Sequence, residues 1–168
     1  MEKTISGLVA LLHEEADIFE TLLEILKKEN EALIHIHVET LHRLAKEKET
    51  LALKGRMCEE TRRHLIDRLR EELSIERETP LSFSDLVQRV PEHLQPALLQ
   101  ARNRLLHVAE KIVLMNSQNN ALIRESLRLI ESSLNLIRQA AGNTTYEKEG
   151  KLHHPGTTNE SLTFSAKV

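Results

Sequence analysis

Apolar residues recur every three or four positions over most of this chain, which is the spacing of one face of an α-helix. The pattern predicts long helices over residues 4–36, 39–73 and 91–141. Glu15 and Glu29 interrupt the stripe of the first helix, and we expect their carboxylates along an exposed margin. The predicted fold is therefore all-α, an elongated antiparallel bundle of three long helices with a short helix in the second connection.

The first connection is predicted in residues 34–40, where the regular spacing of apolar residues is interrupted. Several β-branched residues lower the helix propensity there, although neither Gly nor Pro marks a turn. A hairpin lets the two helices bury each other and is the favoured interpretation. The alternative is one continuous helix over residues 4–73, about 105 Å long at about 1.5 Å per residue.

The second connection contains Pro80 and Pro91, with Pro96 close behind, and these prolines forbid a continuous helix. A short helix is predicted within residues 82–90. The third long helix begins at Pro91 or Pro96 and continues to Ala141, where Gly142-Asn143 is the stop signal. Residues 1–142 are expected to form the bundle. Residues 143–168 are rich in Thr, Gly, Asn and charge, which predicts a flexible C-terminal tail.

The end of the third helix has more apolar surface than one neighbouring helix covers. At about 100° per residue, its apolar side chains spread over roughly half of the circumference. They are Leu122, Ile123, Leu127, Leu129, Ile130, Leu134, Leu136 and Ile137. If the three helices are aligned at one end, the last fifteen or so residues extend about 20 Å past the others. We therefore expect a partner to cover this face.

Asn116, Asn119 and Asn120 form a polar cluster just before this face. A buried Asn is costly unless it is paired, so the cluster can fix the register of helices in the bundle. Equally, the amides can satisfy backbone groups of a bound partner segment. Ser126 and Ser133 follow Asn119 at heptad spacing and allow a partner helix to approach closely.

The amino-acid composition argues against several kinds of function. Aromatic residues make up 2% of the chain and Trp is absent, which favours a Leu/Ile-rich helical bundle over an aromatic-lined pocket. The net charge of −3 has no basic block, so no nucleic-acid partner is expected. The one cysteine forms no intramolecular disulfide, and no segment has the ~20 apolar residues of a membrane span. We expect a cytoplasmic protein that is not embedded in a membrane.

The sequence contains only weak candidates for a metal site or a catalytic residue. Glu39 and His42 form a single E-x-x-H, whereas a di-iron bundle needs two such motifs. Cys58 is expected to behave as a small apolar residue whose thiol pKa is raised by Glu59 and Glu60. We therefore expect no catalytic residue, no metal, no cofactor and no enzymatic activity.

Five segments together resemble a known family. They are residues 8–15 (LVALLHEE), 44–51 (LAKEKETL), 91–106, the element Asn116-x-x-Asn119-x-x-Leu122-Ile123, and Thr145-Tyr146-x-x-x-Gly150. With these segments the chain resembles the FlgN-type flagellar type III export chaperones. Relatives usually carry Asn-Gly where this chain has Asn119-Asn120, which puts in doubt any role that needs a bare backbone there.

The resemblance implies an all-helical cytosolic chaperone with no cofactor. Such a chaperone binds the C-terminal segments of the hook–filament junction (hook-associated) proteins, prevents their premature assembly and delivers them to the membrane export gate. The candidate partner-binding residues are Asn116, Asn119, Leu122, Ile123, Leu127, Ile130, Leu134 and Ile137. Tyr146 is the residue that the resemblance suggests for docking at the export gate; the alternative is a lone aromatic residue that folds back on the bundle.

Two other functions remain open. The third helix can pair with the same helix of a second copy, which would make the chain a structural, self-associating bundle. Weak self-association in the absence of cargo is also compatible with a chaperone. Alternatively, the chain is a chaperone for another flagellar protein, such as the filament cap.

Overall fold

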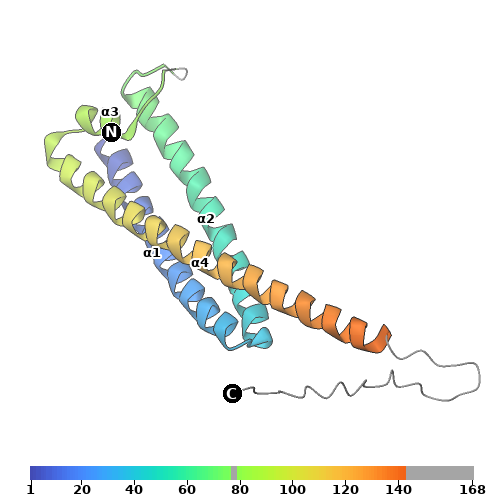
Figure 1. Ribbon diagram of the computed structural model, residues 1–168. Helices are drawn as coiled ribbons and strands as arrows, with labels where there is room; N and C mark the ends of the chain where they lie inside the picture. Colours follow the sequence, from blue (N-terminus) through green and yellow to red (C-terminus); the bar gives the residue numbers. More distant parts are fainter. Residues whose placement is uncertain (77–78, 143–168) are drawn as a thin grey trace, which may run out of the picture. The chain divides into compact units, whose positions relative to one another are not determined.

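A computed structural model describes residues 1–76 and 79–142 of the chain. Its elements are α1 (Glu2–Ile34), α2 (Val38–Glu72), α3 (Phe83–Arg89), the short 3₁₀ helix η1 (Glu92–Leu94) and α4 (Gln95–Gly142) (Figure 1). The predicted all-α class is confirmed, since the described residues are helical apart from the connections. The chain divides into two units, residues 1–123 and 124–168, and each is considered by itself.

α1 and α2 form an antiparallel hairpin, so a continuous rod is ruled out (Figure 1). The turn closes α1 through two backbone hydrogen bonds, from Ile36 N to Leu33 O at 3.4 Å and from His37 N to Ala32 O at 2.9 Å. This is the helix-ending pattern that normally has Gly at its left-handed position. Here Ile36 takes that position, with φ 55° and 76% of its surface exposed. The turn therefore forms without the residue that marks such turns in a sequence.

The main apolar core of the first unit lies where the start of α1 meets the end of α2. It contains Ile5, Leu8, Leu12, Leu69, Leu86, Val90, Leu98 and Ala101. These residues come from α1, α2, α3 and the beginning of α4, so the core fixes all four helices at this end. Full burial of a Leu or Ile side chain contributes about 1.5–3 kcal/mol, which makes this cluster the principal source of cohesion.

The second connection is shaped by α3. Ser82 is its N-cap: the Ser82 hydroxyl accepts from Asp85 N at 3.1 Å, and Ser82 N donates to Asp85 Oδ2 at 3.1 Å. This reciprocal capping box satisfies two backbone donors that the first turn leaves free. α4 begins at Gln95, with Pro96 in its first turn, and η1 occupies the residues after Pro91.

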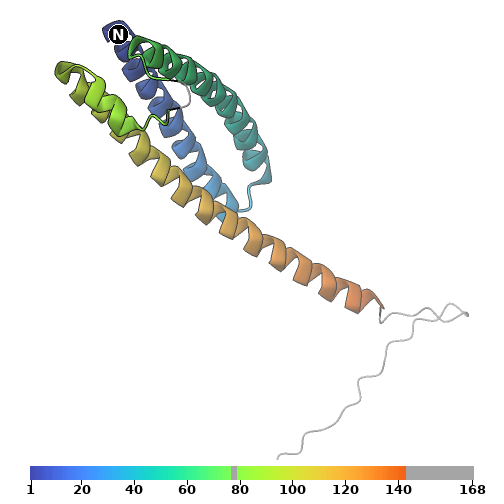
Figure 2. The same cartoon turned by 90° about the horizontal axis from the view of Figure 1, so that it is seen from above.

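In the first unit, α2 and α4 lie on either side of α1 (Figure 2). α4 runs parallel to α1, since Arg104 bonds to Asp17 and Glu20, and Asn119 bonds further along α1, to Leu26 and Glu29. Chain direction therefore alternates from α1 to α2 to α4. α4 has 48 residues against 33 in α1 and 35 in α2.

Candidate functional site

An exposed apolar face occupies the part of α4 in the second unit. Leu127, Ile130, Leu134 and Ile137 lie three or four residues apart, on one side of the helix. Their exposed fractions are 54%, 55%, 46% and 63%. We call these four residues the α4 face. Aliphatic side chains exposed at regular helical spacing are typical of a surface that another helix covers.

The two margins of the α4 face differ in charge. Arg124, Glu131 and Arg138 follow one margin at seven-residue spacing, and Ser126 and Ser133 follow the other. Within the part of the chain that the structure describes, none of these three charged side chains makes an ion pair. The α4 face therefore offers a partner two kinds of edge, one charged and one small and neutral.

The other predicted site residues on α4 lie in the first unit and differ from one another in exposure. Leu122 is half-buried, Ile123 is partly exposed, and Asn116 is exposed. Asn119, by contrast, is only 1% exposed. The structure therefore gives Asn119 different surroundings from the residues with which it was grouped.

Asn119 is the centre of a buried polar cluster that joins α4 to α1. Its Nδ2 donates to Leu26 O at 2.9 Å and to Glu29 Oε2 at 3.0 Å. Its Oδ1 accepts from Asn30 Nδ2 at 2.8 Å. All three contacts lie inside the first unit, and they correspond to the register-fixing alternative for the asparagine cluster. In this arrangement the Asn119 amide has little capacity left for a partner.

Glu29 connects this cluster to α2, because its second carboxylate oxygen accepts a hydrogen bond from Lys48. The prediction that Glu15 and Glu29 lie along an exposed margin is therefore wrong: both are buried. Glu15 Oε1 accepts from Arg62 Nε of α2 at 3.1 Å. Each carboxylate is tolerated inside the bundle because a cation from the neighbouring helix compensates its lost hydration.

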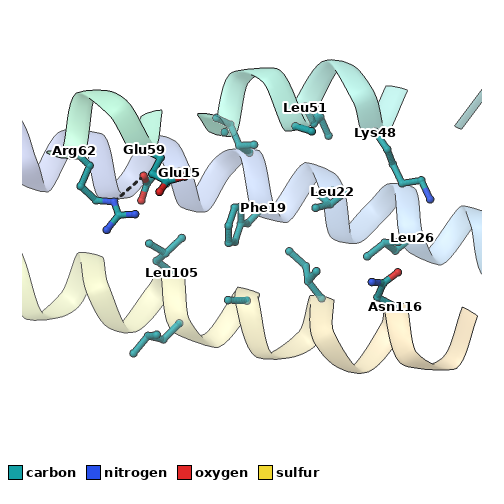
Figure 3. Close-up of a pocket in the computed structure, with 16 residues that line it drawn as sticks. Glu15, Phe19, Leu22, Leu26, Lys48, Leu51, Glu59, Arg62, Leu105 and Asn116 are labelled. Carbon is teal, nitrogen blue, oxygen red and sulfur yellow. Dashed lines mark hydrogen bonds and ion pairs between the residues drawn. The ribbon is translucent and has the colours of Figure 1, made fainter. Parts of the chain in front are cut away.

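The first unit also contains an apolar groove that the sequence did not reveal. α1 forms its floor and α2 and α4 form its walls, and its volume is about 630 Å³ (Figure 3). The floor carries Phe19 and Leu22, and one wall carries Leu105 of α4. Asn116 lies at the edge of this groove, and the Glu15–Arg62 ion pair lies towards its other end (Figure 3). Phe19 and Leu22 lie on the apolar stripe of α1, but in the structure both are only half-buried.

Small residues keep the groove open. Gly55 and Ala52 stand on the α2 wall, and Ala109 stands on the α4 wall. A Cβ atom built on Gly55 would meet nothing within 4 Å. The sequence signal that could have indicated the groove is this occurrence of small residues where the helical pattern calls for larger apolar ones.

Cys58 is buried on α2, as expected for a small apolar residue. Burial raises the pKa of its thiol, with smaller contributions from Glu14 and Glu15 of α1. The expected direction of the shift is confirmed, but the responsible carboxylates belong to α1 and are not Glu59 and Glu60. A thiol held protonated in this way is a poor nucleophile.

Two further findings concern absent features. Among residues 1–76 and 79–142, no group of three His, Cys, Asp or Glu side chains is placed to hold a metal ion. Within the same residues, no helix combines the length and apolarity needed to cross a membrane. Tyr146, the residue suggested for docking at the export gate, and the predicted tail at 143–168 lie outside the described residues.

The comparisons with known proteins give one match. A model of the family described as FlgN protein matches residues 1–154. No curated protein and no solved structure matches the chain.

Proposed function

Since the chain belongs to the FlgN family, which is a family of flagellar export chaperones, we propose that it binds the C-terminal segments of the hook-associated junction proteins. It holds these cargo proteins unassembled in the cytoplasm and delivers them to the export gate. The observation that carries the proposal is the exposed α4 face.

The α4 face is large enough for useful but reversible binding. Full burial of a Leu or Ile side chain contributes about 1.5–3 kcal/mol, and these four side chains are about half exposed. Covering them therefore contributes roughly 3–6 kcal/mol before the cost of ordering the cargo is subtracted. That cost keeps the affinity moderate, which suits a chaperone that must release its cargo.

The expected cargo element is an amphipathic helix with apolar residues at i, i+3, i+4 and i+7. Subunits that polymerise through such helices need a substitute surface while they are monomeric. The α4 face provides one; Leu122 and Ile123, which precede it on α4, are further candidate contacts in the first unit. The hydrogen bonds of Asn119 support a role in fixing the helices of the first unit, and Asn116, which is exposed, remains available to cargo.

The test is calorimetric titration of the full chain with C-terminal segments of the two junction proteins encoded in the same genome. Ile130→Asp/Leu134→Asp is expected to abolish binding, because it places two carboxylates in the centre of the α4 face. Ser132→Asp/Asn135→Asp is the matched control, since it adds the same charge on the side of the helix turned away from the face. Circular dichroism of both variants checks that the helix content is unchanged.

Equal affinity of both variants would remove the α4 face from the proposal. Failure of the unaltered chain to bind either segment would refute the cargo assignment itself. Leu106→Asp provides a third arm, because Leu106 lines the groove of the first unit and not the α4 face. If cargo still binds Ile130→Asp/Leu134→Asp but no longer binds Leu106→Asp, the cargo site lies in the groove and not on the α4 face.

Delivery to the export gate is tested separately with Tyr146→Ala. We expect this variant to bind cargo with unchanged affinity and to reduce secretion of the junction proteins by cells. A loss of cargo binding in the same variant would instead assign Tyr146 to the cargo site.

A further inference from the structure

The charged margin of the α4 face is complementary to itself when a second helix runs in the opposite direction. Arg124 and Glu131 are one heptad apart on this margin, with Leu127 and Ile130 between them on the face. In antiparallel helix pairs, residues on one margin lie against the same margin of the partner, and the two core positions of the heptad face each other. A reversed copy therefore brings Leu127 against the partner's Ile130, and Ile130 against the partner's Leu127.

That register pairs opposite charges twice. Arg124 lies near the partner's Glu131, and by symmetry Glu131 lies near the partner's Arg124. On the other margin, Ser126 lies near the partner's Ser133, so no like charges meet. Leu127 and Ile130 of the two copies thus form two apolar layers flanked by two ion pairs.

The neighbouring arrangements are less favourable. Sliding one helix by a heptad places Arg124 against the partner's Arg124 in one direction and Glu131 against the partner's Glu131 in the other. A parallel pair in register places the charged margin of each helix against the serine margin of the other, which provides no ion pair at all. Charge therefore disfavours the two adjacent registers, in which like charges meet, and the parallel orientation, in which no ion pair forms. The register two heptads away would pair Glu131 with the partner's Arg138, but it would leave Leu127 outside the overlap of the two α4 faces.

From this complementarity we propose that, in the absence of cargo, two copies of this chain associate through antiparallel pairing of their α4 faces. The occupant of the exposed face is then a second copy, and cargo displaces it. The interface is about two heptads long on each helix, below the size of stable dimer interfaces, so the association is weak and reversible. This inference extends the proposed function, because it concerns the state of the protein before cargo binds.

The test is sedimentation velocity of the full chain over a concentration series, with Arg124→Glu, Glu131→Arg and the double variant Arg124→Glu/Glu131→Arg. Each single change converts both ion pairs into repulsive contacts and is expected to weaken association about tenfold. The double variant restores both pairs with their signs exchanged and is expected to associate as the unaltered chain does. Both positions are exposed, so folding is expected to be preserved, and circular dichroism checks this.

The control exchanges Glu125 and Arg128, which form an ion pair with a 3.7 Å separation between Arg128 Nη1 and Glu125 Oε2 on the side away from the α4 face. Glu125→Arg/Arg128→Glu is expected to leave association unchanged. A chain that stays monomeric at the highest concentration, single changes without effect, or a double variant that fails to recover would each overturn the inference.

Cargo titration separates this inference from the proposed function. A chain that binds junction-protein segments but never self-associates refutes only the antiparallel pair. Conversely, charge-dependent self-association without binding of either junction-protein segment supports the pair and refutes the cargo assignment. If both hold, Arg124→Glu is expected to raise the apparent affinity for cargo at high protein concentration, because less of the α4 face is occupied.

Discussion

Replacing Asn119 by alanine tests whether the buried polar cluster holds α4 to α1. The change removes three hydrogen bonds, to Leu26 O, to Glu29 and from Asn30. A neutral bond contributes about 1 kcal/mol and one to a charged group about 1.5–3 kcal/mol. Glu29 keeps its bond to Lys48, and the Leu26 carbonyl keeps its bond within α1, which reduces the penalty for the groups left behind. We therefore expect Asn119→Ala to lower the free energy of unfolding by about 3 kcal/mol.

Thermal unfolding followed by circular dichroism measures this effect. For a chain of this size, 1 kcal/mol corresponds to about 2–4 °C, so the midpoint should fall by roughly 6–12 °C. Asn116→Ala is the matched control: it removes the same side chain one turn earlier on α4, at an exposed position, and should change the midpoint by less than about 2 °C. Equal midpoints for the two variants would refute the reasoning, because the hydrogen bonds of Asn119 would then contribute nothing beyond those of an exposed amide.

Two substitutions and one reactivity measurement test other parts of the structure. Gly55→Ala is expected to raise the free energy of unfolding by about 0.5–1 kcal/mol, because the added Cβ meets open space and glycine is the poorer helix former; urea denaturation measures it. Hydrogen bonds from the Ser82 side chain and backbone hold the pKa of Asp85 below its ordinary value. The α3 cap therefore stabilises the fold fully at pH values above the ordinary pKa of Asp85, and this stabilisation is lost as the pH falls through the lowered pKa. The stability difference between the unaltered chain and Asp85→Asn should accordingly shrink in acid and stay constant from about pH 6 to 8, and a pH-independent difference would contradict this origin. Finally, Cys58 should react with a thiol reagent about 100-fold more slowly in the native protein than in urea, because the buried thiol has a raised pKa and must be exposed by local opening; equal rates would show that α2 is open around it.

Much of the fold follows from local signals in the sequence. The period of apolar residues locates the long helices, the prolines locate the second connection, and Ser82 marks the start of α3. The hairpin was favoured because the apolar phase breaks, yet its turn has no local marker. Ile36 occupies a left-handed position that costs a β-branched residue free energy, so only the packing of α1 against α2 can maintain it.

The errors arise where a side chain depends on a partner distant in the sequence. Glu15 and Glu29 look like surface residues because a carboxylate inside an apolar stripe is costly in isolation. Arg62 and Lys48 remove that cost, and they lie 47 and 19 residues away. Asn119 is similar, since its partners on α1 are 89–93 residues away. Periodicity measures how apolar a face is and contains no information about which cation or amide lies opposite.

The same limit applies to the two exposed apolar surfaces, the groove and the α4 face. Periodicity correctly indicates that Phe19 and Leu22 lie on an apolar face, but it cannot tell whether a neighbour covers them, and in the structure a groove remains over both. For the α4 face the sequence contained more information, because its wide apolar arc exceeds what one neighbour buries. What remained hidden is the order of charges beside it. The complementarity of Arg124 and Glu131 becomes visible only when an antiparallel copy of the helix is placed against them. Under the proposal, a cargo helix must compete with that self-complementary pairing. Under the two proposals, the free energy of cargo binding at this face is a difference between two pairings, so we expect cargo selectivity to depend on the charged margin as well as on the apolar stripe.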